Sequence, residues 1–134
     1  MEQARVNEFA ASLTRCMIGS GFLDRFYELF QNSSEEIAEK FRNTDFERQK
    51  SALRSSLYVM VVAVEGGDAA MAYLDRIARQ HSRAELDIRP QFYEVWLDCL
   101  IQTVKEHDPE YTEETEKLWR EVMRFGIDYI TARY

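Results

Sequence analysis

The amino-acid sequence predicts an all-α protein, and three observations carry this prediction. The 134 residues contain only five glycines and two prolines, whereas the many turns of a sheet protein require such residues. Leu, Ala, Glu, Arg and Met, which favour helices, are abundant. Apolar residues recur at intervals of three and four, the period of an amphipathic helix. Because 46% of the residues are hydrophobic, we expect a single domain, residues 1–134, with seven to eight helices around one core.

Stop and cap residues divide the first half of the chain. Gly19 and Gly21 end the first amphipathic segment, because glycine terminates helices. Ser34 and Asp45 are typical N-cap residues, since their side-chain oxygens can accept hydrogen bonds from the first turn of a helix. We therefore predict four helices in this half, over residues 2–18, 22–30, 35–41 and 46–64.

The second half of the chain contains three further predicted helices. Two glycines, Gly66 and Gly67, break the preceding helix, and we expect Asp68 to cap the helix that carries residues 71–81. An irregular corner follows, and Pro90 suits the first turn of a helix that ends near Glu106. The last helix begins near Thr112 or Glu113. We expect it to bury Leu118, Trp119, Val122, Phe125, Tyr129 and Ile130.

Charge and composition exclude several classes of partner. The net charge of −7 would repel a phosphate backbone, so we expect no nucleic-acid partner. No run of about 18 apolar residues could cross a bilayer, and the first residues do not form a signal peptide. Cys16 and Cys99 have neither CxxC spacing nor the density of a secreted scaffold. We therefore predict two reduced thiols, no membrane association and a cytoplasmic location.

One face of the helix over residues 71–81 ends in an imidazole. Tyr73, Ile77 and His81 are spaced four residues apart and share one side of the helix. A neutral imidazole binds transition metals, and a single protein nitrogen suffices for a haem iron because the porphyrin supplies the equatorial ligands. The alternative is that His81 is a capping or surface residue. His107, near Asp108, is expected to be exposed and is not our candidate ligand.

Five segments resemble, in order and approximate spacing, bacterial single-domain globins and the haem domain of flavohaemoglobins. They are Arg25-Phe26-Tyr27-Glu-Leu-Phe30, Lys40-Phe41-Arg-Asn-Thr-Asp45, Gln49-Lys-Ser-Ala-Leu53, Ile77-Ala78-Arg-Gln-His81 and Trp119. The resemblance covers nearly the whole chain. It implies a globin-like fold of seven to eight helices around a haem pocket, with haem b, an iron protoporphyrin, as cofactor.

The resemblance also implies roles for individual residues. His81 matches the proximal histidine that ligates the iron, and Phe41 matches the aromatic residue that packs on the porphyrin. Tyr27 and Gln49 match the distal pair that hydrogen-bonds a bound gas, whereas an ordinary helical protein would use them as a core and a surface residue. Leu53 matches the apolar residue that closes the pocket, and its spacing of four from Gln49 places both on one helix face.

Two further residues belong to the expected proximal side. The His81 N–H that faces away from iron should donate to a backbone carbonyl, and Ile77 lies one turn back. Tyr93 is expected near the imidazole, although the corner before it is slightly longer than in flavohaemoglobins. That family carries a glutamate on its last helix, whereas residues 129–134 contain no carboxylate side chain. The haem propionates require cations, for which the candidates are Lys50, Arg54, Arg79, Arg83 and Arg89.

These expectations define a function and its alternatives. The first is reversible binding of oxygen, nitric oxide and carbon monoxide at a five-coordinate iron, extended to nitric oxide dioxygenation if an external reductase supplies electrons. The sequence contains no flavin or nicotinamide motif such as GxGxxG. The second is a haem-free, globin-like module for protein interaction or signalling, because function follows the site rather than the fold. The third is a gas sensor that signals through a partner.

Overall fold

The computed structural model describes residues 1–19 and 21–134, and all regular elements in these ranges are α-helices. The described residues form α1 (Gln3–Met17), α2 (Phe22–Gln31), α3 (Glu35–Lys40), α4 (Phe46–Ala63), α5 (Asp68–His81), α6 (Gln91–His107) and α7 (Glu113–Thr131). This confirms the all-α prediction and gives seven helices. Within those ranges, none of the helices combines the length and the apolar character needed to cross a membrane.

Side-chain caps fix the starts of three helices. The Ser34 hydroxyl accepts the backbone N–H of Ile37 (3.2 Å), and the Asp45 carboxylate accepts that of Arg48 (3.3 Å). Both caps were expected from the sequence. The third, at Thr112, forms a capping box with the first turn of α7.

The expected cap of α5 is wrong by one residue. Gly67 occupies the N-cap position, and Asp68 is the first residue of the helix. An acidic side chain in the first turn still stabilises the helix, because its charge lies beside the positive end of the helix dipole. Asp68 therefore does mark the start of α5, but it stabilises the helix through its charge and not as a side-chain cap.

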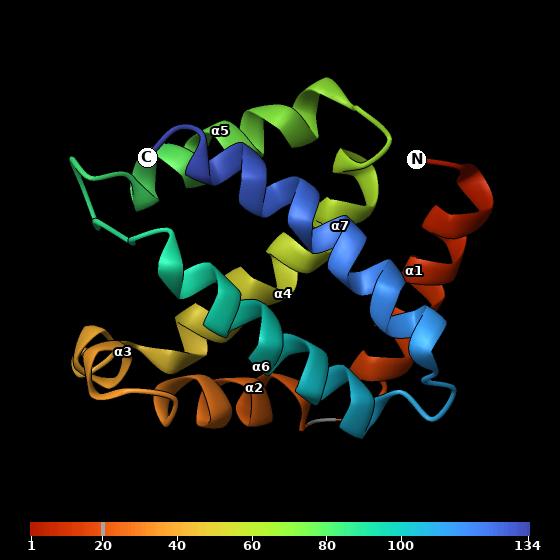
Figure 1. Ribbon diagram of the computed structural model, residues 1–134, viewed down its shortest axis with the longest axis horizontal. Coiled ribbons are helices and arrows are strands. Elements are labelled where there is room, and N and C mark those ends of the chain that lie inside the picture. The colour runs from red at the N-terminus through yellow and green to blue at the C-terminus, as the bar shows by residue number, and fades with distance from the viewer. Residues whose placement is uncertain (20) are drawn as a thin grey trace.

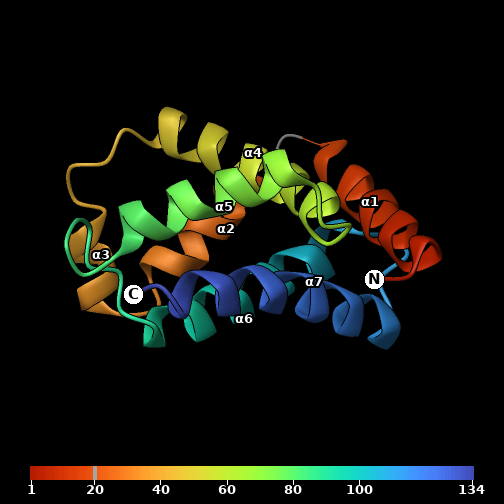
Figure 2. The ribbon, with the colours of Figure 1, turned by 90° about the horizontal axis from the view of Figure 1, so that it is seen from above.

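Two pairs of packed helices frame the molecule, α2 with α6 and α5 with α7. In Figure 1, α2 lies along the lower edge of the view and α5 along the upper edge, α5 and α7 run in the same direction, and α4 runs obliquely between the pairs. The first helix, α1, packs on α4, α6 and α7. Figure 2 shows the corner after α5 and the short helix α3 at the same end of the molecule.

A buried polar network joins α1 to the corner between α6 and α7. The Ser12 hydroxyl donates to the Asp108 carboxylate (2.6 Å) and accepts the indole N–H of Trp119 (2.8 Å). The Arg15 guanidinium donates to the other carboxylate oxygen (2.7 Å). The Trp119 ring also packs edge-to-face on Phe9, with ring centroids 4.7 Å apart. These contacts give the core one specific arrangement, because each buried polar group is matched to a partner.

Two burial expectations need correction. Phe125 is 40% exposed, whereas its neighbour Gly126 is buried. A side chain at Gly126 would come within 3.1 Å of Met60, so α7 turns its small residue toward α4 and Phe125 faces outward. The second correction concerns His107, which is half-buried: its ring packs edge-to-face on Phe22 at 5.6 Å. Both cysteines are free, as predicted.

Candidate functional site

The candidate metal ligand, His81, is the last residue of α5. Its Nδ1 lies 2.9 Å from the backbone carbonyl oxygen of Ile77, as the sequence predicted. A carbonyl only accepts, so Nδ1 carries the proton and Nε2 keeps its lone pair. Burial lowers the pKa of His81, although the hydrogen bond to Ile77 acts in the opposite direction. A neutral imidazole with an unprotonated Nε2 is the form that binds a transition metal.

The corner after His81 is held by backbone hydrogen bonds and by the end of the chain. The Ile88 N–H donates to the His81 carbonyl (3.0 Å), and the Asp87 N–H donates to that of Ser82 (2.8 Å). Asp87 has a φ of 49°, in the left-handed region that non-glycine residues seldom adopt. The Tyr134 hydroxyl donates to the Asp87 carboxylate, which secures this conformation. The imidazole therefore sits between a helix and a tethered corner.

An aromatic cluster forms the second part of the site. It contains Tyr27 from α2, Phe41 immediately after α3 and Phe46 at the start of α4, with ring centroids 5.7 to 5.9 Å apart. The Tyr27 hydroxyl donates to the backbone carbonyl of Gln49 at 3.4 Å. Burial raises the pKa of Tyr27 to about 12, so this phenol is protonated at neutral pH and available as a donor.

The remaining distal candidates lie along one face of α4. Leu53 is buried, and the side chain of Gln49, one turn earlier, is half-buried. The Tyr27 phenol lies against Gln49; burial has the larger effect on the pKa of Tyr27 and raises it, whereas the Gln49 side chain lowers it. The structure thus brings the two distal candidates together.

Phe46 is a site residue that sequence reasoning missed. It contacts Tyr27 and Phe41 and lies on the same face of α4 as the two distal candidates. A signal was present, because Phe46 precedes Gln49 by three residues and Leu53 by seven, which is helical spacing. Phe46 was expected at the start of this helix but was given no role in the site.

Tyr93 contributes an unusual buried atom. Its hydroxyl is buried and has no hydrogen-bond partner among residues 1–19 and 21–134. Burial, and secondarily the nearby Tyr134, raise the pKa of Tyr93 to about 12. Tyr93 was expected near the imidazole, but no hydrogen bond among the described residues joins it to His81. A buried polar atom without a partner is uncommon in native proteins and fits a site shaped for a group other than the polypeptide.

The cations proposed for the haem propionates differ in their surroundings. Lys50 contacts two carboxylates, at 2.8 and 2.9 Å, and Arg89 contacts a glutamate of α3. The Arg83 guanidinium lies over an aromatic ring, 4.8 Å from its centroid. Within the described ranges, Arg54, Arg79 and Arg83 form no ion pair. These three therefore have charges that no protein carboxylate neutralises there.

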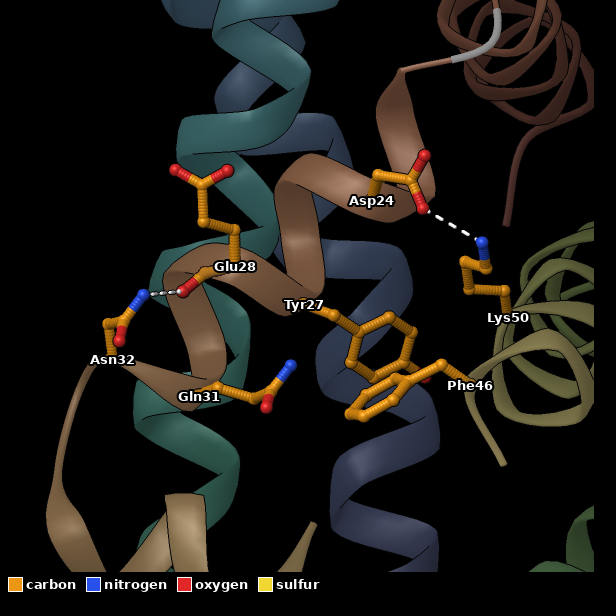
Figure 3. A pocket seen from close by; sticks show the side chains of 7 residues that line it. All are labelled: Asp24, Tyr27, Glu28, Gln31, Asn32, Phe46 and Lys50. Atoms are coloured by element: carbon orange, nitrogen blue, oxygen red, sulfur yellow. Dashed lines mark hydrogen bonds and ion pairs between the residues drawn. The ribbon is translucent and has the colours of Figure 1, made fainter. Parts of the chain in front are cut away.

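A pocket of about 330 Å³ opens beside Tyr27, between α2 and the first turns of α4 (Figure 3). Tyr27 and Phe46 supply its aromatic wall. The pocket is lined by Asp24, Tyr27, Glu28, Gln31, Asn32, Phe46 and Lys50.

Comparisons with known proteins agree with this geometry. The Globin family model matches residues 25–130, a range that includes both the imidazole and the aromatic cluster. Among solved structures, the chain is similar to PA3967 from Pseudomonas aeruginosa PAO1, which is described as structurally highly homologous to a human hemoglobin. The two are 39% identical, with a TM-score of 0.92, and the match covers 97% of this chain and 98% of that chain. No curated protein matches.

Proposed function

Because the chain belongs to the globin family of haem-based gas-binding proteins, we propose that it holds haem b through His81 and reversibly binds oxygen, nitric oxide and carbon monoxide. The observation that carries this proposal is the hydrogen bond from His81 Nδ1 to the Ile77 carbonyl (2.9 Å). It orients the ring and leaves Nε2 free to ligate iron, as second-shell partners of metal-binding histidines do.

The proximal side of the site would be built by α5 and α6. His81 supplies the metal ligand, and Ile77 fixes its tautomer and adds an apolar surface. Tyr93, whose hydroxyl is buried without a partner in the described structure, would complete this side. Residues 129–134 contain no glutamate that could increase electron donation by the imidazole, and this favours ligand binding over strongly activating chemistry.

The opposite side would be built by the aromatic cluster and α4. Phe41 would pack on the porphyrin, and Leu53 would close the pocket above it. Haem iron, when bound, offers one open coordination position for a diatomic gas. Tyr27 and Gln49 would donate hydrogen bonds to that gas, each worth roughly 1 to 3 kcal/mol in a dry site. To do so, the Tyr27 hydroxyl must exchange its long, 3.4 Å hydrogen bond to the Gln49 carbonyl for the ligand.

We extend the proposal to turnover and location. With haem held by His81, the protein would also be able to convert oxygen and nitric oxide to nitrate if an external reductase supplied electrons. The cytoplasm is the compartment that agrees best with two free thiols, Cys16 and Cys99, because it keeps cysteines reduced.

The ligand assignment is tested with two histidine variants. His107 is a matched control, because it also ends a helix and its Nδ1 lies 2.8 Å from the carbonyl four residues earlier, that of Thr103. After reconstitution with haem and desalting, we expect His81→Ala to lose stoichiometric haem while its far-ultraviolet circular dichroism stays helical. His107→Ala should keep a Soret band that shifts with carbon monoxide.

Three outcomes of this experiment bear on the proposal. Unchanged haem content in His81→Ala would reject the ligand assignment. A pyridine haemochrome spectrum other than that of haem b would reject the cofactor. A wild-type protein that stays colourless after reconstitution would instead favour the haem-free interaction module.

A further inference from the structure

The pocket between α2 and α4 opens to solvent and has Tyr27, the candidate distal donor, in its wall. The phenol is otherwise buried at 5% exposure. Figure 3 shows the Phe46 ring lying across the hydroxyl end of Tyr27. The Phe46 ring therefore covers the hydroxyl end of the candidate distal donor.

Phe46 is placed where a side chain can move at low cost. It is the first residue of α4, and it packs against the core without being part of its fully buried set. Its ring is half-buried and makes an edge-to-face contact with Tyr27 at 5.7 Å and a tilted contact with Phe41 at 5.9 Å. Rotation of this ring breaks these contacts but leaves the fully buried core intact.

A salt bridge spans the outer part of the pocket. The Lys50 ammonium on α4 donates to the Asp24 carboxylate on α2 at 2.8 Å, as drawn in Figure 3. This bridge joins the two helices at the mouth. The Asp24 side chain is 66% exposed, so the bridge lies at the rim and does not fill the pocket. The barrier to entry is therefore the aromatic wall.

We propose that a small neutral molecule reaches the Tyr27 side of the haem site through this pocket, and that the Phe46 ring is the gate. The inference rests on the proposed function. A volume of about 330 Å³ far exceeds a diatomic gas, so the gate, and not the mouth, limits its entry. The gate and the adjacent Tyr27 are aromatic, which suits an uncharged ligand at this point, whereas the other five lining residues are polar or charged.

Carbon monoxide rebinding after flash photolysis tests the gate. Opening it gives up an edge-to-face contact worth about 0.5 to 1.5 kcal/mol, so Phe46→Ala should raise the bimolecular association rate roughly two- to tenfold. Phe46→Trp, with a larger ring, should lower that rate. Phe125→Ala removes an exposed phenylalanine on α7, outside the pocket lining, and should leave the rate unchanged.

A second measurement does not depend on haem. Tetranitromethane is a small neutral reagent that nitrates accessible tyrosines, and peptide mass mapping identifies the modified residue. We expect nitration of Tyr27 to be several-fold faster in Phe46→Ala and slower in Phe46→Trp than in the wild type. Far-ultraviolet circular dichroism of both variants establishes that they are folded.

The possible failures can be told apart. If the wild type has no Soret band, the proposed function fails. If the Soret band is normal but both Phe46 variants rebind carbon monoxide at the wild-type rate, only the gate is refuted. Nitration of Tyr27 at the wild-type rate in both variants would likewise show that Phe46 does not cover the phenol.

Discussion

Replacement of Asp108 by Asn tests the buried network between α1 and the corner after α6. The carboxylate is shielded from solvent and accepts hydrogen bonds from Ser12 (2.6 Å), from Arg15 (2.7 Å) and from the backbone N–H of Glu110 (2.9 Å). An amide retains one acceptor oxygen, but its NH₂ group only donates and would face another donor. The substitution also removes the negative charge opposite Arg15.

The cost can be bracketed from the exposure of the partner. Loss of one member of a buried ion pair costs about 3 to 5 kcal/mol when the remaining charge stays buried. The Arg15 side chain is 26% exposed, so water can solvate it in the variant. We therefore expect a loss at the lower end of this range, about 3 kcal/mol in the free energy of unfolding. For a chain of 134 residues, this loss lowers the melting temperature by roughly 10 °C.

Urea unfolding followed by circular dichroism at pH 7 measures this loss, with wild type and variants at equal haem loading. Asp98→Asn is the matched control. The Asp98 side chain is 70% exposed and lies 3.2 Å from Arg120, so its removal should cost less than about 1 kcal/mol. Equal losses in the two variants would show that burial of Asp108 has no special energetic role.

The pH dependence of this difference has a defined sign. Burial opposes ionisation of Asp108, but hydrogen bonds from Arg15, Ser12 and the Glu110 N–H outweigh burial and lower its pKa. A carboxylate with a depressed folded-state pKa contributes stability above its unfolded pKa of about 3.9, and this contribution is lost as the pH falls through the folded value. The gap between wild type and Asp108→Asn should therefore be constant near neutral pH and shrink below about pH 4.

Three other predictions concern the site and the surface. Tyr27→Phe should speed oxygen dissociation about fivefold or more in stopped-flow measurements, because loss of one hydrogen bond costs about 1 kcal/mol or more; an unchanged rate would place the phenol away from the ligand. Cys16 is buried, which raises its pKa to about 12, so Ellman's reagent at pH 8 should react in the native protein only with the half-buried Cys99. A reaction that persists in Cys99→Ser would contradict this assignment. Phe125→Ser should change the unfolding free energy by less than about 1 kcal/mol, as is usual for exposed positions, and a larger loss in urea would indicate hidden packing.

The parts of the fold that the sequence predicted depend on neighbours close in the chain. Ser34 and Asp45 marked helix starts because a capping side chain reaches only the first turn. The contact between His81 and Ile77 was predictable for the same reason, since four residues are one helical turn. These local rules were enough for the helix order and for the orientation of the imidazole.

The sequence predictions failed where contacts between segments far apart in the chain determine which way a side chain faces. Periodicity placed Phe125 inward, but the contact of Gly126 with Met60, on another helix, sets the rotation of α7. The contact of Phe46 with Tyr27 also joins separate helices, and nothing in the local pattern distinguishes it from an ordinary apolar position. The roles of the site residues remain predictions, because contacts with a haem cannot be deduced from protein packing.

The Ser12 hydroxyl has a consequence for biosynthesis. Its two partners, Asp108 and Trp119, lie 96 and 107 residues further along the chain. At a synthesis rate of about 5 to 20 residues per second, Trp119 is added roughly 5 to 20 s after Ser12. Until then α1 lacks its contacts with α7 and the Ser12 hydroxyl lacks its indole partner, so the nascent chain must keep its first helix from aggregating while the ribosome completes the last one.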